Sequence, residues 1–249
     1  MTMLNDFPLH QLQFYLTAPY PCSYLPEKMA RSQVATPNYL IDTSVYNELI
    51  QIGFRRSGVY TYRPQCDFCH ACVPVRLKTA EFSRDRAQRR AWRRHHGMQT
   101  VLRNLSFDPE HYALYRRYQL ARHPGGGMDR DNQAQYRQFL LESSVATHLV
   151  EFREDDKLRM VSIVDRVYDG LSSVYTFFEP EVRAASLGTY SILWQAEWCQ
   201  QRGLSHVYLG YWIAQSKKMA YKTKFRPLQG LIRGQWQDLS PSATESGSE

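Results

Sequence analysis

The chain has 249 residues and a mass of 29.2 kDa, which is enough for one large domain or two small ones. Its 43% apolar and 22% charged residues are typical of a globular protein and exclude wholesale disorder or a coiled coil. The longest uncharged apolar stretch, residues 187–196, is about half of the ~20 residues that a membrane span needs. Asp6 and Pro8 interrupt any signal-peptide core. We therefore expect a soluble, cytoplasmic protein without membrane association.

The first 82 residues predict a small α+β module. Hydrophobic spacing predicts a helix over residues 42–52, which would end at Gly53. Strand-like runs at 59–62 and 73–77 lie on either side of a cysteine-rich loop. We therefore place an N-terminal module at residues 1–82.

Four of the five cysteines belong to this module. Cys66, Cys69 and Cys72 are spaced as metal ligands, because three thiolates on one loop can converge on an ion, and Cys22 could supply a fourth. Zinc and an iron–sulfur cluster both accept four cysteines, and the spacing does not choose between them. Reduced, buried thiols without a metal are the alternative, whereas the odd cysteine count and the intracellular setting argue against disulfides. Cys199 falls in the apolar pattern of a helix and is expected in the core.

The positive charge of the chain is concentrated in one segment. The formal net charge is +7, and residues 83–96 contain six Arg and one Asp, so this segment carries +5 and the rest of the chain +2. A helix over these residues would place four arginines on one face, namely Arg86, Arg89, Arg90 and Arg93. Such a face favours nucleic-acid phosphates, although a solvated helix paired with acidic residues is the alternative. We treat residues 83–104 as an Arg-rich helix and linker.

The second half has a different order of elements. Amphipathic helices are predicted at 111–122 and 132–144, and strands at 147–152, 158–167 and 172–178. A helix at 187–202, a strand at 206–209, a basic helix at 216–222 and a strand at 229–233 follow. Antiparallel hairpins followed by helix, strand, helix and strand are typical of an N-acetyltransferase-like (GNAT-like) domain, which we place at 105–238. Residues 239–249 lack core-forming side chains and are expected to be disordered.

A GNAT-like domain transfers an acyl group from a donor that lies beside a splayed central strand. Acetyltransferases of this type bind the coenzyme A pyrophosphate at a glycine-rich helix N-terminus. The corresponding segment, residues 186–189, holds only one glycine, which is poor evidence for coenzyme A. In a basic protein, an activated ester on a polyanion, aminoacyl-tRNA, is the better donor.

The chain resembles the bacterial branch of the arginyl-tRNA–protein transferase family, the aspartate/glutamate leucyltransferases. The resemblance covers roughly residues 15–237. The segments that carry it are Pro21–Leu25, Gly53–Gly58, Cys66–Cys72 with Pro74 and Arg76, Tyr115, Tyr118, Arg122, His123, Tyr175–Pro180, Ser186–Gly188, Tyr208–Tyr211, Lys218–Lys222 and Phe225–Pro227. One departure is Gln229, which stands where the family pattern usually has a carboxylate.

The resemblance implies transfer of leucine from leucyl-tRNA to proteins that begin with Asp or Glu, as in the N-degron pathway of protein degradation. An acidic acceptor calls for Arg in its pocket, and Arg55, Arg56 and Arg76 are the candidates. Lys218 and Lys222 are spaced i, i+4 and suit phosphates of the tRNA, as the arginine helix does. A surface or structural role is the alternative for each of these residues.

Aminolysis of an activated ester needs a neutral amine, a stabilised oxyanion and a proton for the departing ribose hydroxyl. Asp165 is the candidate for holding or deprotonating the amine, because an acid near the end of an apolar strand needs an explanation. Tyr175 and Tyr211 are candidates for hydrogen bonds to the ester or ribose, although most of the 17 tyrosines are expected in the core.

Three other interpretations remain open at this point. One is arginyl transfer by the same mechanism, and a second is a coenzyme A-dependent N-acetyltransferase. The third is a non-enzymatic nucleic-acid-binding protein with a four-cysteine metal ribbon. We expect a monomer that needs no cofactor for its chemistry, with an iron–sulfur cluster or zinc in a structural or regulatory role.

Overall fold

The computed structural model describes residues 8–181 and 186–239, and these form a mixed α+β fold with an eight-stranded sheet, a four-stranded sheet and a short two-stranded sheet. Within these residues no helix has the length and apolar character to cross a membrane. The tail expected at 239–249 lies outside the described residues, except for Leu239. That residue is buried in the core, so the core extends one residue into the expected tail.

The N-terminal part contains a four-stranded antiparallel sheet in the order β1-β4-β6-β5. Helix α1 (Thr43–Gln51) begins at Asp42, whose carboxylate accepts a hydrogen bond from the backbone N–H of Val45. The other elements of this part are η1 (Pro8–Gln11), β1 (Gln13–Leu16), β2 (Tyr20–Pro21), β3 (Met29–Ala30), β4 (Ser32–Thr36), η2 (Asn38–Leu40), β5 (Arg55–Ser57) and β6 (Tyr60–Pro64).

The large sheet has eight strands in the order β14-β13-β7-β12-β11-β10-β9-β8. Its strands are β7 (Val73–Lys78), β8 (Gln99–Arg103), β9 (Thr147–Glu154), β10 (Lys157–Val167), β11 (Gly170–Phe178), β12 (His206–Trp212), β13 (Leu228–Ile232) and β14 (Gln235–Asp238). β11 and β12 run parallel, whereas the other neighbouring strands are antiparallel.

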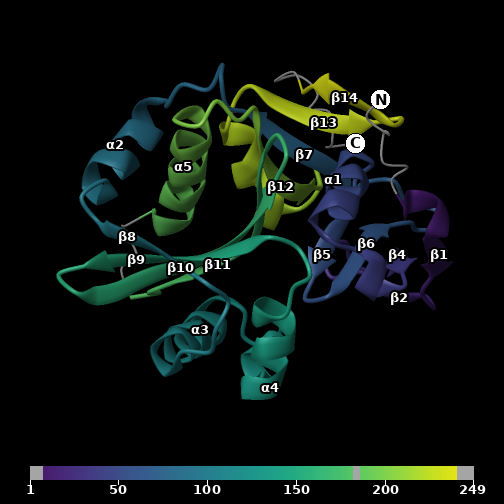
Figure 1. Cartoon of the computed structure of the whole chain (residues 1–249), viewed down its shortest axis with the longest axis horizontal. Coiled ribbons are helices and arrows are strands. Elements are labelled where there is room, and N and C mark those ends of the chain that lie inside the picture. The colour runs from purple at the N-terminus through teal and green to yellow at the C-terminus, as the bar shows by residue number, and fades with distance from the viewer. Residues whose placement is uncertain (1–7, 182–185, 240–249) are drawn as a thin grey trace, which may run out of the picture.

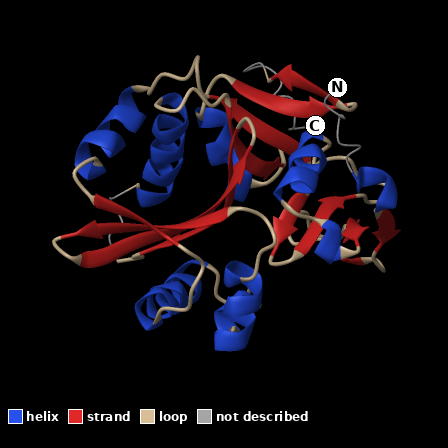
Figure 2. Cartoon of the chain, viewed as in Figure 1, coloured by secondary structure: helices blue, strands red, loops and turns tan. Residues whose placement is uncertain are grey.

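Helices cover both faces of this sheet, as Figures 1 and 2 show. Helices α2 (Arg86–His95) and α5 (Leu187–Gln200) lie side by side on one face, and α3 (Pro109–Arg122) and α4 (Gln133–Tyr136) lie on the other. The remaining helical turns are η3 (Met128–Arg130), the π-helical η4 (Arg137–Leu141) and the 3₁₀ helix η5 (Lys217–Lys224). The helix expected over 132–144 is thus divided into α4 and η4, and the basic helix expected at 216–222 is 3₁₀ rather than α.

Two strands correct the expected domain organisation. β7 was expected to close the N-terminal module, but it lies between β12 and β13 in the large sheet. β8 falls in the expected linker and forms the edge strand beside β9. Val75 and Leu77 of β7 are fully buried in the large core. Alternating apolar residues show that a segment is a strand, but they carry no information about which strand it pairs with.

A buried ion pair anchors the small sheet to the large one. Arg56 of β5 donates to Asp165 of β10 through two bonds, Nη2 to Oδ1 at 2.6 Å and Nε to Oδ2 at 2.8 Å. The Thr147 hydroxyl donates to the same carboxylate at 2.7 Å, and Arg56 Nη1 donates to the Gly58 carbonyl at 3.0 Å. The two side chains are 2% and 0% exposed. Arg56 and Asp165 neutralise each other inside the core, which is a structural contact rather than the predicted contact with a substrate.

We expect Asp165→Asn to destabilise the fold by roughly 3–5 kcal/mol, because removing one partner leaves a buried charge uncompensated. Urea unfolding measures this loss, and the double variant Arg56→Met/Asp165→Leu should recover much of it because no buried charge remains. An Asp165→Asn protein of unchanged stability that has lost transfer activity would contradict the structural role and restore the catalytic one.

Candidate active site at the splay of two strands

The two parallel strands β11 and β12 separate in the middle of the large sheet. They pair only over Gly170–Ser172 and His206–Tyr208. Just beyond, each strand contains an extra residue relative to its antiparallel neighbour, Val174 in β11 and Leu209 in β12. Such bulges bend a strand and are frequent next to active sites. The parallel strands therefore diverge where both are bulged, and the GNAT-like assignment of this part stays a prediction.

Arg55 lies in this splay, between the two strands. Its Nη2 donates to the carbonyl of Ser173 in β11, and its Nη1 donates to that of Tyr208 in β12 at 3.4 Å. The residue is 8% exposed. Among the described residues Arg55 forms no ion pair with a carboxylate, so only carbonyl dipoles offset its buried charge.

Lys222 of η5 is a second buried cation at the same place. It is 5% exposed, and its Nζ donates to the carbonyl of Tyr211 in β12. A Cβ at Gly210 would lie 3.7 Å from Lys222 Nζ and 3.8 Å from Arg55 Nε, so both cations lie against this glycine. Burial and the nearby Arg55 charge lower the pKa of Lys222 to about 7, although Cys72 acts in the opposite direction.

Lys222 does not share an exposed helix face with Lys218, as the predicted pair of phosphate ligands requires. Lys218 is exposed, whereas Lys222 faces the core. Residues four apart share a face in an α-helix, but in a 3₁₀ helix of three residues per turn they point about 120° apart. Contact of Lys218 with a tRNA phosphate stays a prediction.

Tyrosines surround the splay, but the two proposed as catalytic occupy different surroundings. The Tyr211 hydroxyl donates to the Gly53 carbonyl at 2.9 Å, which ties β12 to the N-terminal part. The Tyr175 hydroxyl accepts from Gln119 of α3 at 2.8 Å on the other side of β11. Burial raises the pKa of both hydroxyls, so both stay protonated. Tyr211 thus has a structural contact, and its catalytic role and that of Tyr175 stay predictions.

Arg76 does not join Arg55. Its Nε donates to Gln229 at 3.0 Å, and its Nη1 donates to Gln51 and to the Tyr208 hydroxyl, both at 3.1 Å. Its guanidinium carbon also lies 4.3 Å from the ring centroid of Trp236. The amide oxygen of Gln229 is therefore a neutral acceptor for Arg76. The structure brings none of the three predicted acceptor arginines together, and of these only Arg55 lies in the splay.

The four cysteines of the predicted metal site lie in one neighbourhood but do not form a ligand set. Burial and the charges of Cys66, Cys22 and Cys69 raise the pKa of the Cys72 thiol to about 12. The Cys66 thiol donates to the Arg31 carbonyl at 3.8 Å. Across residues 8–181 and 186–239, no three His, Cys, Asp or Glu side chains are grouped closely enough to hold an ion. Metal binding therefore stays a prediction from the spacing, and no step of the chemistry is derived from it.

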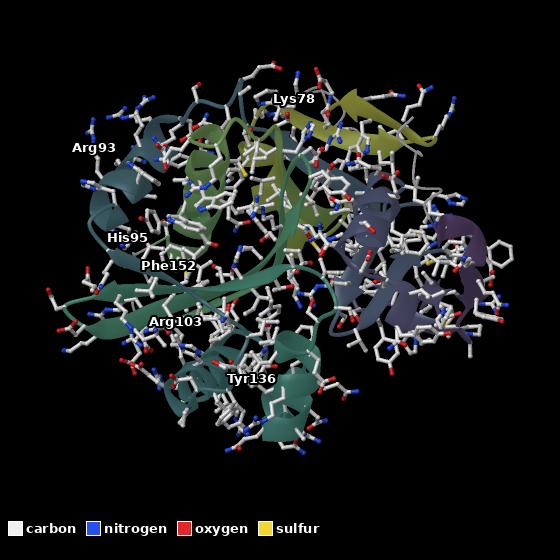
Figure 3. The ribbon with its side chains drawn as sticks, viewed as in Figure 1. Lys78, Arg93, His95, Arg103, Tyr136 and Phe152 are labelled. Carbon is white, nitrogen blue, oxygen red and sulfur yellow. The ribbon has the colours of Figure 1, made fainter. Side chains whose placement is uncertain are left out.

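The arginine helix is exposed as the sequence predicts. Asp85 and Gln88 form a capping box at the start of α2, and Gln88, Ala91 and His95 face the core. Figure 3 shows Arg93 on the outer side of this helix. The four predicted arginines are all exposed, and within the described part of the chain none forms an ion pair with a carboxylate: Arg86, Arg89, Arg90 and Arg93.

Sequence reasoning missed the parts of the site that depend on strand geometry. Gly210 follows the extra residue of β12 and has φ +78°. A glycine inside a predicted strand indicates a bulge, so the sequence did contain a signal for this one. The bulge at Val174 has no comparable signal, because any residue can be accommodated there. The Ser173 carbonyl is a backbone group that no side-chain pattern reveals.

Comparison with known proteins places this geometry in a family. Residues 20–90 match the model of the N terminus, and residues 110–232 that of the C terminus, of the arginine-tRNA-protein transferases. Among solved structures, L-PGS from Bacillus licheniformis has a TM-score of 0.49 and 10% identity over 76% of this chain and 62% of that chain, which is too low to carry an argument.

The similar curated proteins match nearly end to end. The aspartate/glutamate leucyltransferase of Nitrosospira multiformis is 61% identical, over 96% of this chain and 95% of that protein. Those of Chromobacterium violaceum and Polynucleobacter asymbioticus are 58% and 53% identical, over 92% and 97% of this chain and 94% and 100% of theirs. The chain therefore belongs to the aspartate/glutamate leucyltransferases of the arginyl-tRNA–protein transferase family.

Proposed function

We propose that this protein transfers leucine from leucyl-tRNA to the N-terminal amino group of proteins that begin with Asp or Glu. Aminoacyl-tRNA as donor places the reaction in the cytoplasm, and the leucylated product is a substrate for N-degron degradation. The observation that carries the proposal is the pair of buried cations, Arg55 and Lys222, that lie in the splay without a carboxylate partner among the described residues.

A buried positive charge without a counter-ion is unfavourable, and an anionic ligand removes that cost. Arg55 and Lys222 can offer donors to a carboxylate in a water-poor site. The acidic side chain of the acceptor is such a ligand. Binding it there would fix the acceptor's first residue and hold its α-amino group next to β11 and β12.

Because the ester of leucyl-tRNA is already activated, holding the amine next to its carbonyl carbon can supply much of the rate acceleration. The neutral amine attacks the ester carbonyl carbon of leucyl-tRNA, so an N–C bond forms and a tetrahedral oxyanion appears. The bond to the ribose oxygen breaks, the amine loses a proton, and the ribose oxygen gains one. β11 and β12 do not pair with each other beyond Ser172 and Tyr208, so the backbone on their facing edges is the candidate to bind the ester and the amine.

The chemistry as proposed uses no cofactor, and we expect the protein to act as a monomer. A zinc ion or an iron–sulfur cluster at the cysteine loop is proposed only as a structural or regulatory group. Metal analysis of protein purified without oxygen, compared with Cys66→Ala, would test it.

The proposed activity is tested by mixing the protein with radiolabelled aminoacyl-tRNA and peptides that begin with Asp, Glu, Lys or Ala. We expect label from leucyl-tRNA on the Asp and Glu peptides alone. Label from arginyl-tRNA would show an arginyl transferase instead, and acetylation of the peptides by acetyl-coenzyme A would show an acetyltransferase. No label from leucyl-tRNA on either acidic peptide would refute the proposal.

If Lys222 binds the acceptor carboxylate, the KM for the acceptor should depend on the protonation of Lys222. With its pKa near 7, Lys222 is charged below neutrality and attracts a carboxylate, and it becomes neutral as the pH rises. The KM for an Asp peptide should therefore rise between about pH 6 and pH 8.5 in the wild type. Lys222→Met should have a raised KM at pH 6 and lack this rise.

Steady-state kinetics across this range measure the effect. The titration of the peptide's own amine affects both proteins equally and cancels in the comparison. The exposed Lys224 of the same helix supplies the control, because Lys224→Met should keep the wild-type profile. A Lys222→Met protein with an unchanged KM would remove Lys222 from the acceptor site.

The arginine face of α2 predicts a salt-dependent interaction with tRNA. Replacing Arg89 and Arg93 with Ala should weaken tRNA binding and reduce the slope of log K against log salt by roughly one for each phosphate that is no longer bound. Arg233→Asn, in the turn between β13 and β14 far from α2 (Figure 1), should leave the slope unchanged. An unchanged slope in the double variant would count against the α2 surface.

A further inference from the structure

A cavity lined with aromatic rings opens between α2 and α5. Its volume is about 190 Å³, and Trp92, Trp194, Trp198 and Tyr190 contribute to its wall. A cavity of roughly 150 Å³ is enough to hold a benzene ring, so this one has room for a single planar ring system. Three of the five tryptophans of the chain thus lie around one surface cavity, each of them only partly buried.

Neighbouring guanidinium groups hold two of these rings in place. Arg84 lies over the Trp92 ring, with its guanidinium carbon 3.8 Å from the ring centroid, and Glu197 pairs with the same arginine. Arg202 lies 4.0 Å from the centroid of Trp198. Because these contacts already fix the two rings, binding a planar ligand between them costs less side-chain entropy.

The cavity lies on the flank of the arginine face. Trp92 of α2 lies between Arg89 and Arg93 in the sequence, and His96, one turn after Trp92, also lines the cavity. Both arginines are exposed. A polyanion bound along this helix would therefore pass beside the aromatic wall.

We propose that the cavity binds one unstacked base of the tRNA, stacked on the tryptophan rings, while the arginine face binds the neighbouring phosphates. The proposal rests on the proposed function and assigns a second contact region of its donor. Bases that leave a helix typically stack on aromatic side chains and bond through their edges. Thr100, Glu197 and Gln201 line the same cavity and supply polar groups for such an edge.

An aromatic side chain of the protein acceptor would also fit the cavity by size. The charges favour the nucleic acid, because the four exposed arginines of the α2 face, at 86, 89, 90 and 93, form no ion pair with a carboxylate in the described residues. The acceptor already has a cationic site of its own, at Arg55 and Lys222. We therefore make the protein occupant an outcome of the test.

The test uses the full-length protein and deacylated leucine tRNA, with two variants that act in opposite ways. Trp198→Leu removes a stacking ring, and Gln201→Trp places a ring of its own at the cavity from an exposed position. Stacking on an aromatic residue contributes enough affinity that each variant should raise the Kd by about 5- to 150-fold. The slope of log K against log salt should stay as in the wild type, because the arginines that bind the phosphates are unchanged.

Gln237→Trp, at an exposed glutamine of β14, is the matched control and should bind tRNA like the wild type. Urea unfolding verifies that each variant is folded. A wild-type Kd in both folded variants overturns the base site. A rise with Trp198→Leu but not with Gln201→Trp also overturns it, because that pattern indicates a displaced helix. An unchanged tRNA Kd with a raised KM for the acceptor assigns the cavity to the protein substrate instead.

Leucyl transfer by the wild type, measured in parallel, separates this proposal from the proposed function. Transfer with unchanged tRNA binding in the variants overturns the base site alone. A wild type that binds tRNA but transfers no leucine overturns the proposed function, and the variants' Kd values still decide the base site. A wild type that does not bind tRNA overturns both.

Discussion

The structure depends on two consecutive arginines of one short strand. Arg56 of β5 pairs with the buried carboxylate of Asp165 and holds the small sheet against the large one. Arg55 donates to carbonyl groups of β11 and β12 where these strands diverge. Neighbouring residues of a strand point to opposite faces, so one strand can serve both purposes. The pair with Asp165 thus positions the cation on which the candidate site is built.

The two arginines differ in how their charge is offset. We therefore give Arg56 a structural role and Arg55 a functional one. Asp165 neutralises Arg56, and such a pair needs nothing further. In the described part of the chain Arg55 and Lys222 donate hydrogen bonds to carbonyl oxygens, and Lys222 Nζ also lies 5.8 Å from the centroid of the Tyr221 ring. A protein that maintains two buried cations without an anion retains a destabilising feature, and a functional reason is the usual explanation. A carboxylate on the substrate supplies that reason.

The elements predicted from hydrophobic spacing were largely confirmed, because periodicity is a local property. Helix α2, with its exposed arginines, and the strands β9 to β11 lie where the pattern places them. The pattern predicts β7 as a strand that closes the N-terminal module, but its pairing partners β12 and β13 lie more than a hundred residues away, in the large sheet. The i, i+4 spacing predicts Lys218 and Lys222 on one face of a helix, whereas the 3₁₀ geometry of η5 turns Lys222 inward.

The family, the cationic helix and the residue types that recognise a carboxylate and a polyanion can be read from the amino-acid sequence. These follow from composition and from the order of short motifs, which do not depend on the path of the chain between them. Three features become visible only in the folded chain, namely which arginine is available, the splay of two strands at paired bulges, and the three tryptophans around one cavity. Such features arise where distant segments meet, and they depend on burial and on strand pairing, neither of which is encoded within any single segment.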